Sequence, residues 1–422
     1  MVTSRFTGLW RHADFMKLWA GQTISEFGSV VSRDALPLVA VLTLTATPAQ
    51  MGVLAALGSL PALLIGLPAG AWVDRTRRKP IMIAADVASA ALLASIPVAY
   101  LLGALRMEQL YVVAALAGGL ALLFDVAYTS YLPSLVERQH VVEGNSKLSA
   151  SESVSEIGGS ALAGALVQTL SAPLAVAVDA LSFLASAVSL ALIRKPEPRP
   201  APPPNPNLRR EIADGLRALA THSILRALTA AAITGVFFGN FYAALYGLYA
   251  IRELGIGPAA LGLLIASGGI GSFLGAMSAA PAARRFGVGP VLIGSAVLSG
   301  VLGLLTPLAA YVGAAAVAFL FVAQIAGDLV RTVYTIHALS LRQIVTPDRL
   351  LGRMNASVEF VQGGAATIGV LAGGLLGQAL GVQAAVWIAA LGSMLPVVWL
   401  IASPVRRLPA FGGLPDGRLT IQ

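Results

Sequence analysis

The sequence predicts an all-α membrane protein with twelve transmembrane helices in two parallel repeats of six. The prediction rests on an apolar composition, a regular succession of long apolar segments and an internal repeat. Hydrophobic residues make up 57% of the 422 residues, and charged residues make up 11%. A soluble domain carries roughly 25% charged residues. The chain therefore has too few charges to cover a surface that faces water.

Apolar segments long enough to cross a bilayer recur along the whole chain. A spanning helix needs about 20 apolar residues, and charged or Pro/Gly-rich breaks separate such segments here. We expect spans near residues 18–46, 50–72, 80–104, 109–132, 146–170, 173–193, 224–251, 259–283, 288–309, 311–340, 353–380 and 383–402.

The basic residues indicate how the chain is oriented. Most of the 28 Lys and Arg residues fall in alternate loops, in the central linker and near the two ends. The opposite loops hold only Arg106 and Arg252, while Arg33 and Arg331 fall inside predicted spans. Cytoplasmic loops carry the excess of Lys and Arg. We therefore expect a multi-pass protein of the cell membrane with both termini cytoplasmic.

An internal repeat divides the chain. Asn145, Gly164 and Gln168 align with Asn355, Gly374 and Gln378 at a constant offset of 210 residues. We expect six-helix halves at 1–193 and 223–405, a cytoplasmic linker at 194–222 and a cytoplasmic tail at 406–422. Parallel repeats of this kind place a substrate site between them, near the bilayer midplane.

The linker itself has two parts. Residues 196–206 are Pro-rich and are expected to be extended. Residues 207–222 are amphipathic, which is typical of a helix lying on the membrane surface. An ordinary solvated connector is the alternative interpretation.

The segment GAWVDRTRRKP at residues 70–80 resembles the loop signature of the major facilitator superfamily (MFS). A weaker copy lies at residues 279–287, in the corresponding loop of the second half. Residues 124–136, 178–188 and 348–357 are similar to the drug- and siderophore-efflux branch, which includes enterobactin exporters and macrolide efflux proteins. The resemblance covers essentially the whole chain. The residues that match the loop signature are Gly70, Asp74, Arg75, Arg78 and Lys79.

The resemblance implies the MFS fold, secondary transport by alternating access, and a gating role for the five matching residues. Asp74 also has a physical rationale. A carboxylate between two spans can accept hydrogen bonds from a helix N-terminus or pair with Arg, and so latch the cytoplasmic side. The alternative is that the basic residues only anchor the topology. Two features of many proton-coupled members are absent: an Arg early in the fourth span, and a Pro where Ser160 stands.

Ionisable residues inside spans are the main candidates for coupling or for contact with substrate. Each costs roughly 2.5–3.5 kcal/mol at a helix centre, so such groups normally face a cavity or a partner. Asp34 and Asp125 are interpreted as proton-coupling or cation-contacting groups, or else as members of structural pairs with Arg33 or Arg331. Asp179, Glu152 and Glu156 also fall within or near spans. The full candidate set is Glu26, Arg33, Asp34, Asp125, Asp328, Arg331, Asn240 and Phe241.

Two members of this set come from an aromatic segment, residues 235–249. Phe241 is a candidate for lining a hydrophobic pocket, with Asn240 as its polar contact; packing against lipid is the competing interpretation. Asp328 and Arg331 are spaced to pair with each other on one helix.

Other functional classes find no support in the sequence. It has no P-loop, no Cys, and four His residues without metal-ligand spacing. We therefore expect neither an enzyme nor a bound metal or cofactor. The net charge of +8 is attributed to the orientation of the chain in the membrane rather than to nucleic-acid binding.

The expected function is export of a lipophilic drug-like or siderophore-like small molecule by a monomer, with protons as the coupling ion. The alternatives are an uptake permease and a non-transporting protein on the same scaffold, such as a sensor or partner subunit.

Overall fold

The computed structural model describes residues 8–73, 75–137, 140–197, 217, 221–346 and 351–408, and within these ranges the regular elements are all helical. The first half contains α1 (Ala13–Leu38), α2 (Pro48–Val73), α3 (Arg78–Leu101), α4 (Met107–Leu135), α5 (Val141–Thr169) and α6 (Ala172–Ala191). The second contains α8 (Ser223–Leu248), α9 (Pro258–Phe286), α10 (Val288–Gly303), α11 (Leu305–Leu308), α12 (Ala316–Val345), α13 (Leu351–Leu380), α14 (Val382–Gly392) and α15 (Pro396–Ile401).

These helices confirm the predicted fold class. The tenth predicted span differs, because α12 begins at Ala316 rather than near residue 311. Two short 3-10 turns, Ala309–Tyr311 and Gly313–Ala315, precede it. The amphipathic stretch and the tail fall almost entirely outside the described residues.

Ten of the described helical segments are long and apolar enough to cross a membrane, judged by length and composition. α1 and α5 are not among them. Both have spanning length, with 26 and 29 residues, but they carry several charged residues and many Ser residues. Their polar content indicates that they face something other than lipid.

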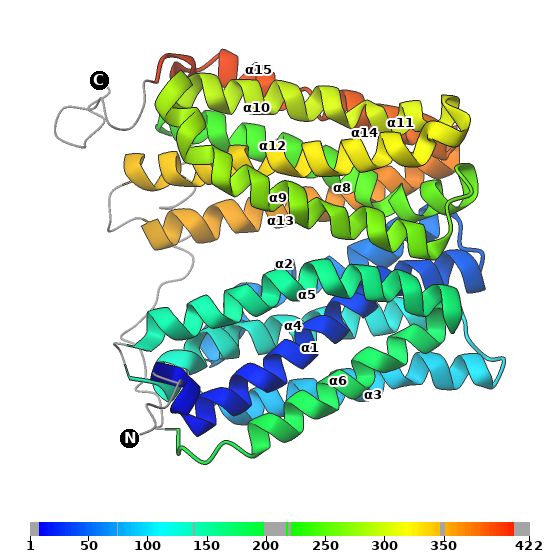
Figure 1. Cartoon of the computed structure of the whole chain (residues 1–422), viewed down its shortest axis with the longest axis vertical. Helices are drawn as coiled ribbons and strands as arrows, with labels where there is room; N and C mark the ends of the chain where they lie inside the picture. The colour runs from blue at the N-terminus through cyan, green and yellow to red at the C-terminus, as the bar shows by residue number, and fades with distance from the viewer. Residues whose placement is uncertain are drawn as a thin grey trace, which may run out of the picture. The chain divides into compact units, whose positions relative to one another are not determined.

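The chain divides into two compact units. Unit 1 comprises Met1–Thr47, Leu54–Asn205 and Gly257–Ala266; unit 2 comprises Pro48–Val53, Pro206–Ile256 and Ser267–Gln422. In unit 1, α1 packs against α5 and α6, and α3 packs against α4 and α6 (Figure 1). In unit 2, α8 packs against α13, α14 and α15, and α10 packs against α12 (Figure 1).

The two units are built around matching apolar cores. In unit 1 the buried cluster contains Leu18, Met82, Tyr131 and Leu190. In unit 2 the residues 210 positions later, Leu228, Leu292, Leu341 and Leu400, form the corresponding cluster. The same register therefore relates four helices of each half. Between membrane-spanning helices such side chains stabilise the fold by close van der Waals packing rather than by removal from water.

Backbone irregularities repeat in the same register. α1 and α8 each end in a π-helical turn, Val39–Thr43 and Tyr249–Glu253. Left-handed residues also occur in pairs 210 apart: Thr45 (φ 50°) with Gly255 (65°), Gly103 (65°) with Gly313 (53°), and Ser171 (136°) with Gly381 (88°). The repeat therefore extends beyond the residues that revealed it in the sequence. Any position in one half can be compared with its counterpart 210 residues away.

Two glycines allow α13 to approach α8 closely. A Cβ on Gly373 would lie 2.5 Å from the carbonyl oxygen of Phe241 and 2.9 Å from its Cα, and Gly369 meets the Phe237 carbonyl in the same way. Gly364, on the same helix, has no such neighbour within 4 Å. Small residues at this spacing let helix backbones meet in a membrane.

We predict opposite effects for alanine at these two sites. Gly364→Ala should be neutral or stabilising by up to about 1 kcal/mol, because Ala favours the helix. Gly373→Ala should destabilise by about 1–3 kcal/mol, because the added methyl meets backbone atoms that must move. Thermal unfolding of the purified protein in detergent measures both. Equal shifts for the two variants would show that the close approach is not a constraint.

Candidate functional site

A polar cavity of about 590 Å³ lies within unit 1. α1, α3, α4, α5 and α6 all contribute to it. Its lining includes the carboxylates Glu26, Asp86, Asp125 and Glu152. Phe124 and Tyr128 of α4 also line it, with their rings stacked 6.0 Å apart. The cavity accounts for part of the polarity of α1 and α5, because Glu26 and Glu152 are among the residues with which these helices line it.

The charge of this cavity is one-sided. No Lys or Arg is among the residues that line it, and none of the ion pairs found among the described residues includes Glu26, Asp86, Asp125 or Glu152. Asp125 and Glu152 are exposed and Glu26 is half-buried. Such a cavity attracts a cation or a proton.

Asp86 differs from the other three carboxylates in its burial. Its residue is 1% exposed, and neither carboxylate oxygen has a hydrogen-bond partner. Asp179 of α6, 2% exposed, lies close enough to Asp86 to act on it electrostatically. Sequence reasoning missed Asp86. Its place inside the predicted span 80–104 was the signal that would have found it.

Arg33 of α1, outside the cavity, pairs with α5. Arg33 donates to both carboxylate oxygens of Glu156, at 2.9 and 2.8 Å. These two side chains are 51% and 53% exposed. A weaker bond of 3.4 Å joins Arg33 Nε to Asp34 Oδ1. Of the two expected coupling residues, Asp34 is thus beside an Arg, whereas Asp125 lies in the cavity without one.

A smaller cavity of about 330 Å³ lies within unit 2. It contains Asp328 and Arg331, and these pair as the sequence predicts, with Nη2 2.8 Å from Oδ1. Gln324 Nε2 also donates to Asp328 Oδ2 at 2.5 Å. The carboxylate in this cavity is therefore neutralised, unlike those in unit 1.

The two candidates from the aromatic segment do not line this cavity. Phe241 is 1% exposed and packs against Gly373. The side-chain amide of Asn240 donates to the Val236 carbonyl on its own helix, at 2.9 Å. The aromatic residues that do line the cavity are Phe238, Tyr242 and Tyr246.

The loop between α2 and α3 holds the residues of the MFS signature. Asp74 lies outside the described residues, and Gly70 falls within α2 with its surroundings undescribed. Arg75 is exposed. Lys79 donates through Nζ to the Ile193 carbonyl at the end of α6, at 2.6 Å.

Glu197 in the linker caps α3, which the sequence did not predict. Its carboxylate accepts the backbone N–H groups of Arg78 and Lys79 at 2.8 and 3.0 Å, and the Arg78 guanidinium lies 3.6 Å away. A carboxylate at a helix N-terminus satisfies unpaired N–H groups and interacts favourably with the helix dipole. The start of the linker is thereby fixed to the signature loop.

Asp14 holds the linker in a similar way, before the first predicted span begins. Its carboxylate accepts the backbone N–H groups of Arg194 and Lys195 at 3.2 and 3.0 Å, and Lys17 Nζ at 2.7 Å. Burial acts to raise the pKa of Asp14, but these hydrogen bonds outweigh it and hold the pKa below its usual value. The carboxylate therefore stays ionised.

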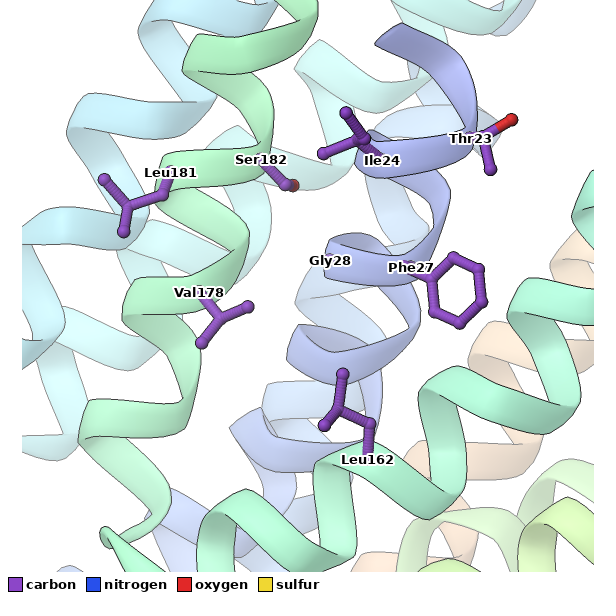
Figure 2. Close-up of a pocket in the computed structure, with 8 residues that line it drawn as sticks. All are labelled: Thr23, Ile24, Phe27, Gly28, Leu162, Val178, Leu181 and Ser182. Atoms are coloured by element: carbon purple, nitrogen blue, oxygen red, sulfur yellow. The ribbon is translucent and has the colours of Figure 1, made fainter. Parts of the chain in front are cut away.

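An apolar groove of about 430 Å³ occupies another face of unit 1 (Figure 2). Figure 2 shows Ile24 and Phe27 of α1, Leu162 of α5, and Val178 and Leu181 of α6 around it. Its mainly apolar side chains suit contact with lipid chains rather than recognition of a polar ligand. Among the described residues, no three His, Asp or Glu side chains meet in an arrangement that could hold a metal ion.

The family model for the transmembrane secretion effector, an MFS family, matches residues 3–415. An uncharacterised MFS-type transporter, YfiS of Bacillus subtilis, is 33% identical over 42% of this chain and 41% of its own length. Macrolide efflux protein A of Streptococcus pyogenes is 25% identical over 51% of this chain and 53% of its own. The chain thus spans about half the length of these relatives or less.

Solved structures show the same fold at low identity. A bacterial homologue of the iron transporter ferroportin, in an inward-facing state, has a TM-score of 0.75 at 17% identity, covering 94% of this chain and 99% of its own. The nucleoside transporter NupG, as a D323A mutant, has a TM-score of 0.73 at 12% identity, covering 92% and 99%. These likenesses establish the architecture.

We predict that Glu197→Ala destabilises the protein by about 0.5–2 kcal/mol, the usual cost of losing a helix cap. Glu253→Ala is the matched control, because Glu253 is an exposed Glu at another helix end. Thermal unfolding in detergent compares the two variants. If Glu197→Ala behaves like the control, Glu197 does not cap α3 in the folded protein.

Proposed function

Because the chain belongs to the transmembrane secretion effector family of the major facilitator superfamily, we propose that it is a secondary active exporter working by alternating access. The cargo is a lipophilic, drug-like small molecule, and protons are the coupling ion. The protein works in the cell membrane with both termini and the linker cytoplasmic, as the distribution of Lys and Arg favours.

The observation that carries the proposal is the acidic cavity of unit 1. Its carboxylates have no basic partner among the residues that line it, and unpaired charges within a membrane are costly. The second half has uncharged residues at the corresponding positions: Val236 for Glu26, Ala296 for Asp86, Thr335 for Asp125 and Gln362 for Glu152. A six-helix half is therefore built without these charges. A sensor or partner subunit on the same scaffold has no evident use for them.

The same cavity favours a cargo with positive charge over an anionic, siderophore-like one. Four carboxylates supply the charge, and the Phe124–Tyr128 stack supplies an aromatic surface on which a cation is attracted. A similar chain is a macrolide efflux protein, and macrolides that carry an amino sugar combine a large apolar surface with one cationic group. Asp125, unpaired in the cavity, is the proposed coupling residue; Asp34, beside Arg33, is proposed to be structural.

We predict that proteoliposomes of the full chain accumulate tetraphenylphosphonium when a proton gradient is imposed, and not tetraphenylborate, an anion of nearly the same shape. Asp125→Asn should abolish the substrate-stimulated proton flux, while Asp34→Asn and the exposed control Glu253→Gln should retain it. A pH-sensitive dye and an ion-selective electrode measure the two fluxes. Reversing the gradient tests direction, since an uptake permease would accumulate cargo with the opposite gradient.

Each outcome tests one part of the proposal separately. Transport of the anion but not the cation contradicts the cationic cargo. Coupled flux that survives Asp125→Asn but is lost in Asp34→Asn contradicts the coupling assignment. No transport of either ion or of an amino-sugar macrolide supports the non-transporting alternative.

The proposed gate has its own test. Asp74→Asn should abolish transport of a cation that the purified protein still binds, because the change acts on the cytoplasmic latch and not on the cavity. Equilibrium binding of tetraphenylphosphonium and its flux are measured on the same preparation. Wild-type flux in Asp74→Asn would leave the signature loop with only a topological role.

A further inference from the structure

Two carboxyl groups are buried where the helices of unit 1 meet. Asp86 belongs to α3 and Asp179 to α6, and these helices pack against each other. Neither oxygen of Asp86 has a hydrogen-bond partner. Asp179 Oδ1 accepts a hydrogen bond of 3.0 Å from the Ser182 hydroxyl on the same helix. Both residues are at least nine-tenths buried.

The surroundings of this pair contain acids and hydroxyl groups. From α1, Glu26 acts electrostatically on Asp179, and Ser29 and Ser32 lie near it. From α6, Ser186 lies near Asp86. α4 contributes Asp125 and Tyr128 to the same cavity, and α5 contributes Glu152. No ion pair found among the described residues includes Asp86 or Asp179.

This arrangement is unfavourable while both groups are ionised. A buried carboxylate without a compensating charge or hydrogen bonds is neutralised rather than left charged. Two carboxylates near each other raise the cost further, so that one retains a proton. Uptake of a proton from water converts one carboxylate to an uncharged carboxylic acid and so removes the repulsion between the two groups.

The internal repeat shows that this polar cluster is not needed for helix packing. Asp86 corresponds to Ala296 and Asp179 to Ala389, both buried. In unit 1 the α1–α6 contact places Gly28 against Ser182 and Asp179. In unit 2 the α8–α14 contact at the same register places Phe238 against Gly392. The second half thus fills with an aromatic ring the position at which the first half keeps polar groups.

Asp86 connects the pair to the acidic cavity. It is part of the cavity lining, together with the exposed carboxylates Asp125 and Glu152. Asp86 therefore joins the buried pair to the lining of the cavity. We infer that Asp86 and Asp179 form a proton-binding site on the buried side of the acidic cavity. As a coupling site it rests on the proposed function; as a proton-binding site it does not.

Infrared difference spectroscopy of the purified full chain tests the site without any substrate. Spectra recorded across a pH titration should show the C=O absorption of a protonated carboxylic acid, identified by its shift in D₂O. The absorption should decrease in Asp86→Asn and in Asp179→Asn, and decrease further in the double variant. Glu253→Gln, which changes an exposed carboxyl outside the cavity, should leave it unchanged.

Two alanine variants serve as controls for a loss of folding. Asp86→Ala and Asp179→Ala introduce the residues that the second half has at these positions, so both should fold, with thermal stability equal to or above that of the wild type. A double variant that keeps the full wild-type absorption overturns the inference, as does a large loss of stability in both alanine variants.

Failure of the proposed function is distinguishable from failure of this site. If the absorption behaves as expected but no cargo is transported, the site stands and the exporter proposal fails. If transport is proton-coupled and the double variant keeps the full absorption, the exporter proposal stands and the site fails. When both hold, the double variant should exchange tetraphenylphosphonium across the membrane at equilibrium but lose accumulation driven by a proton gradient.

Discussion

The structure depends on one constraint. A carboxylate that lies among membrane-spanning helices without a counter-charge is energetically costly. Unit 2 meets it by pairing Asp328 with Arg331. Unit 1 meets it differently, by gathering Glu26, Asp86, Asp125 and Glu152 around a polar cavity. The exposed members are open to solvation, whereas the most buried one, Asp86, must find a proton or a cation. The cavity accounts for part of the polar content that sets α1 and α5 apart from the apolar spans.

The 210-residue repeat provides an internal control that a single domain lacks. Helix starts, π-helical turns, left-handed residues and apolar cores keep the register, so these features belong to the fold. Glu26, Asp86 and Asp179 have Val236, Ala296 and Ala389 as their counterparts. Charges that one half carries and the other omits while keeping the same packing are best explained by function. Both halves therefore form the scaffold, and the first half also carries the unpaired carboxylates.

The fold could be predicted from the sequence because the bilayer constrains it strongly. The bilayer requires long apolar segments, and the Lys and Arg residues concentrate on its cytoplasmic side. The sequence also identified Glu26 and Asp125 as charges inside spans, and the Asp328–Arg331 pair from the spacing of these two residues.

The sequence did not predict the partners that come from distant helices. Arg33 pairs with Glu156 on α5, and Glu197 caps α3 across 119 positions of the chain. Asp86 was missed although an acid inside a predicted span is itself a signal, and its closeness to Asp179 on α6 could not be predicted from the sequence. For Phe241 the sequence left pocket lining and packing as alternatives, and the structure buries this residue beside α13.

Proton release on ligand binding tests the central claim most directly, that protons and a cationic cargo compete for the acidic chemistry of the first half. Tetraphenylphosphonium is added to the purified full chain in weakly buffered detergent, and a pH-indicator dye follows the medium. The account predicts acidification that saturates with binding and is reduced in the Asp86→Asn/Asp179→Asn double variant. Saturable binding of the cation with no release of protons at any pH would contradict it.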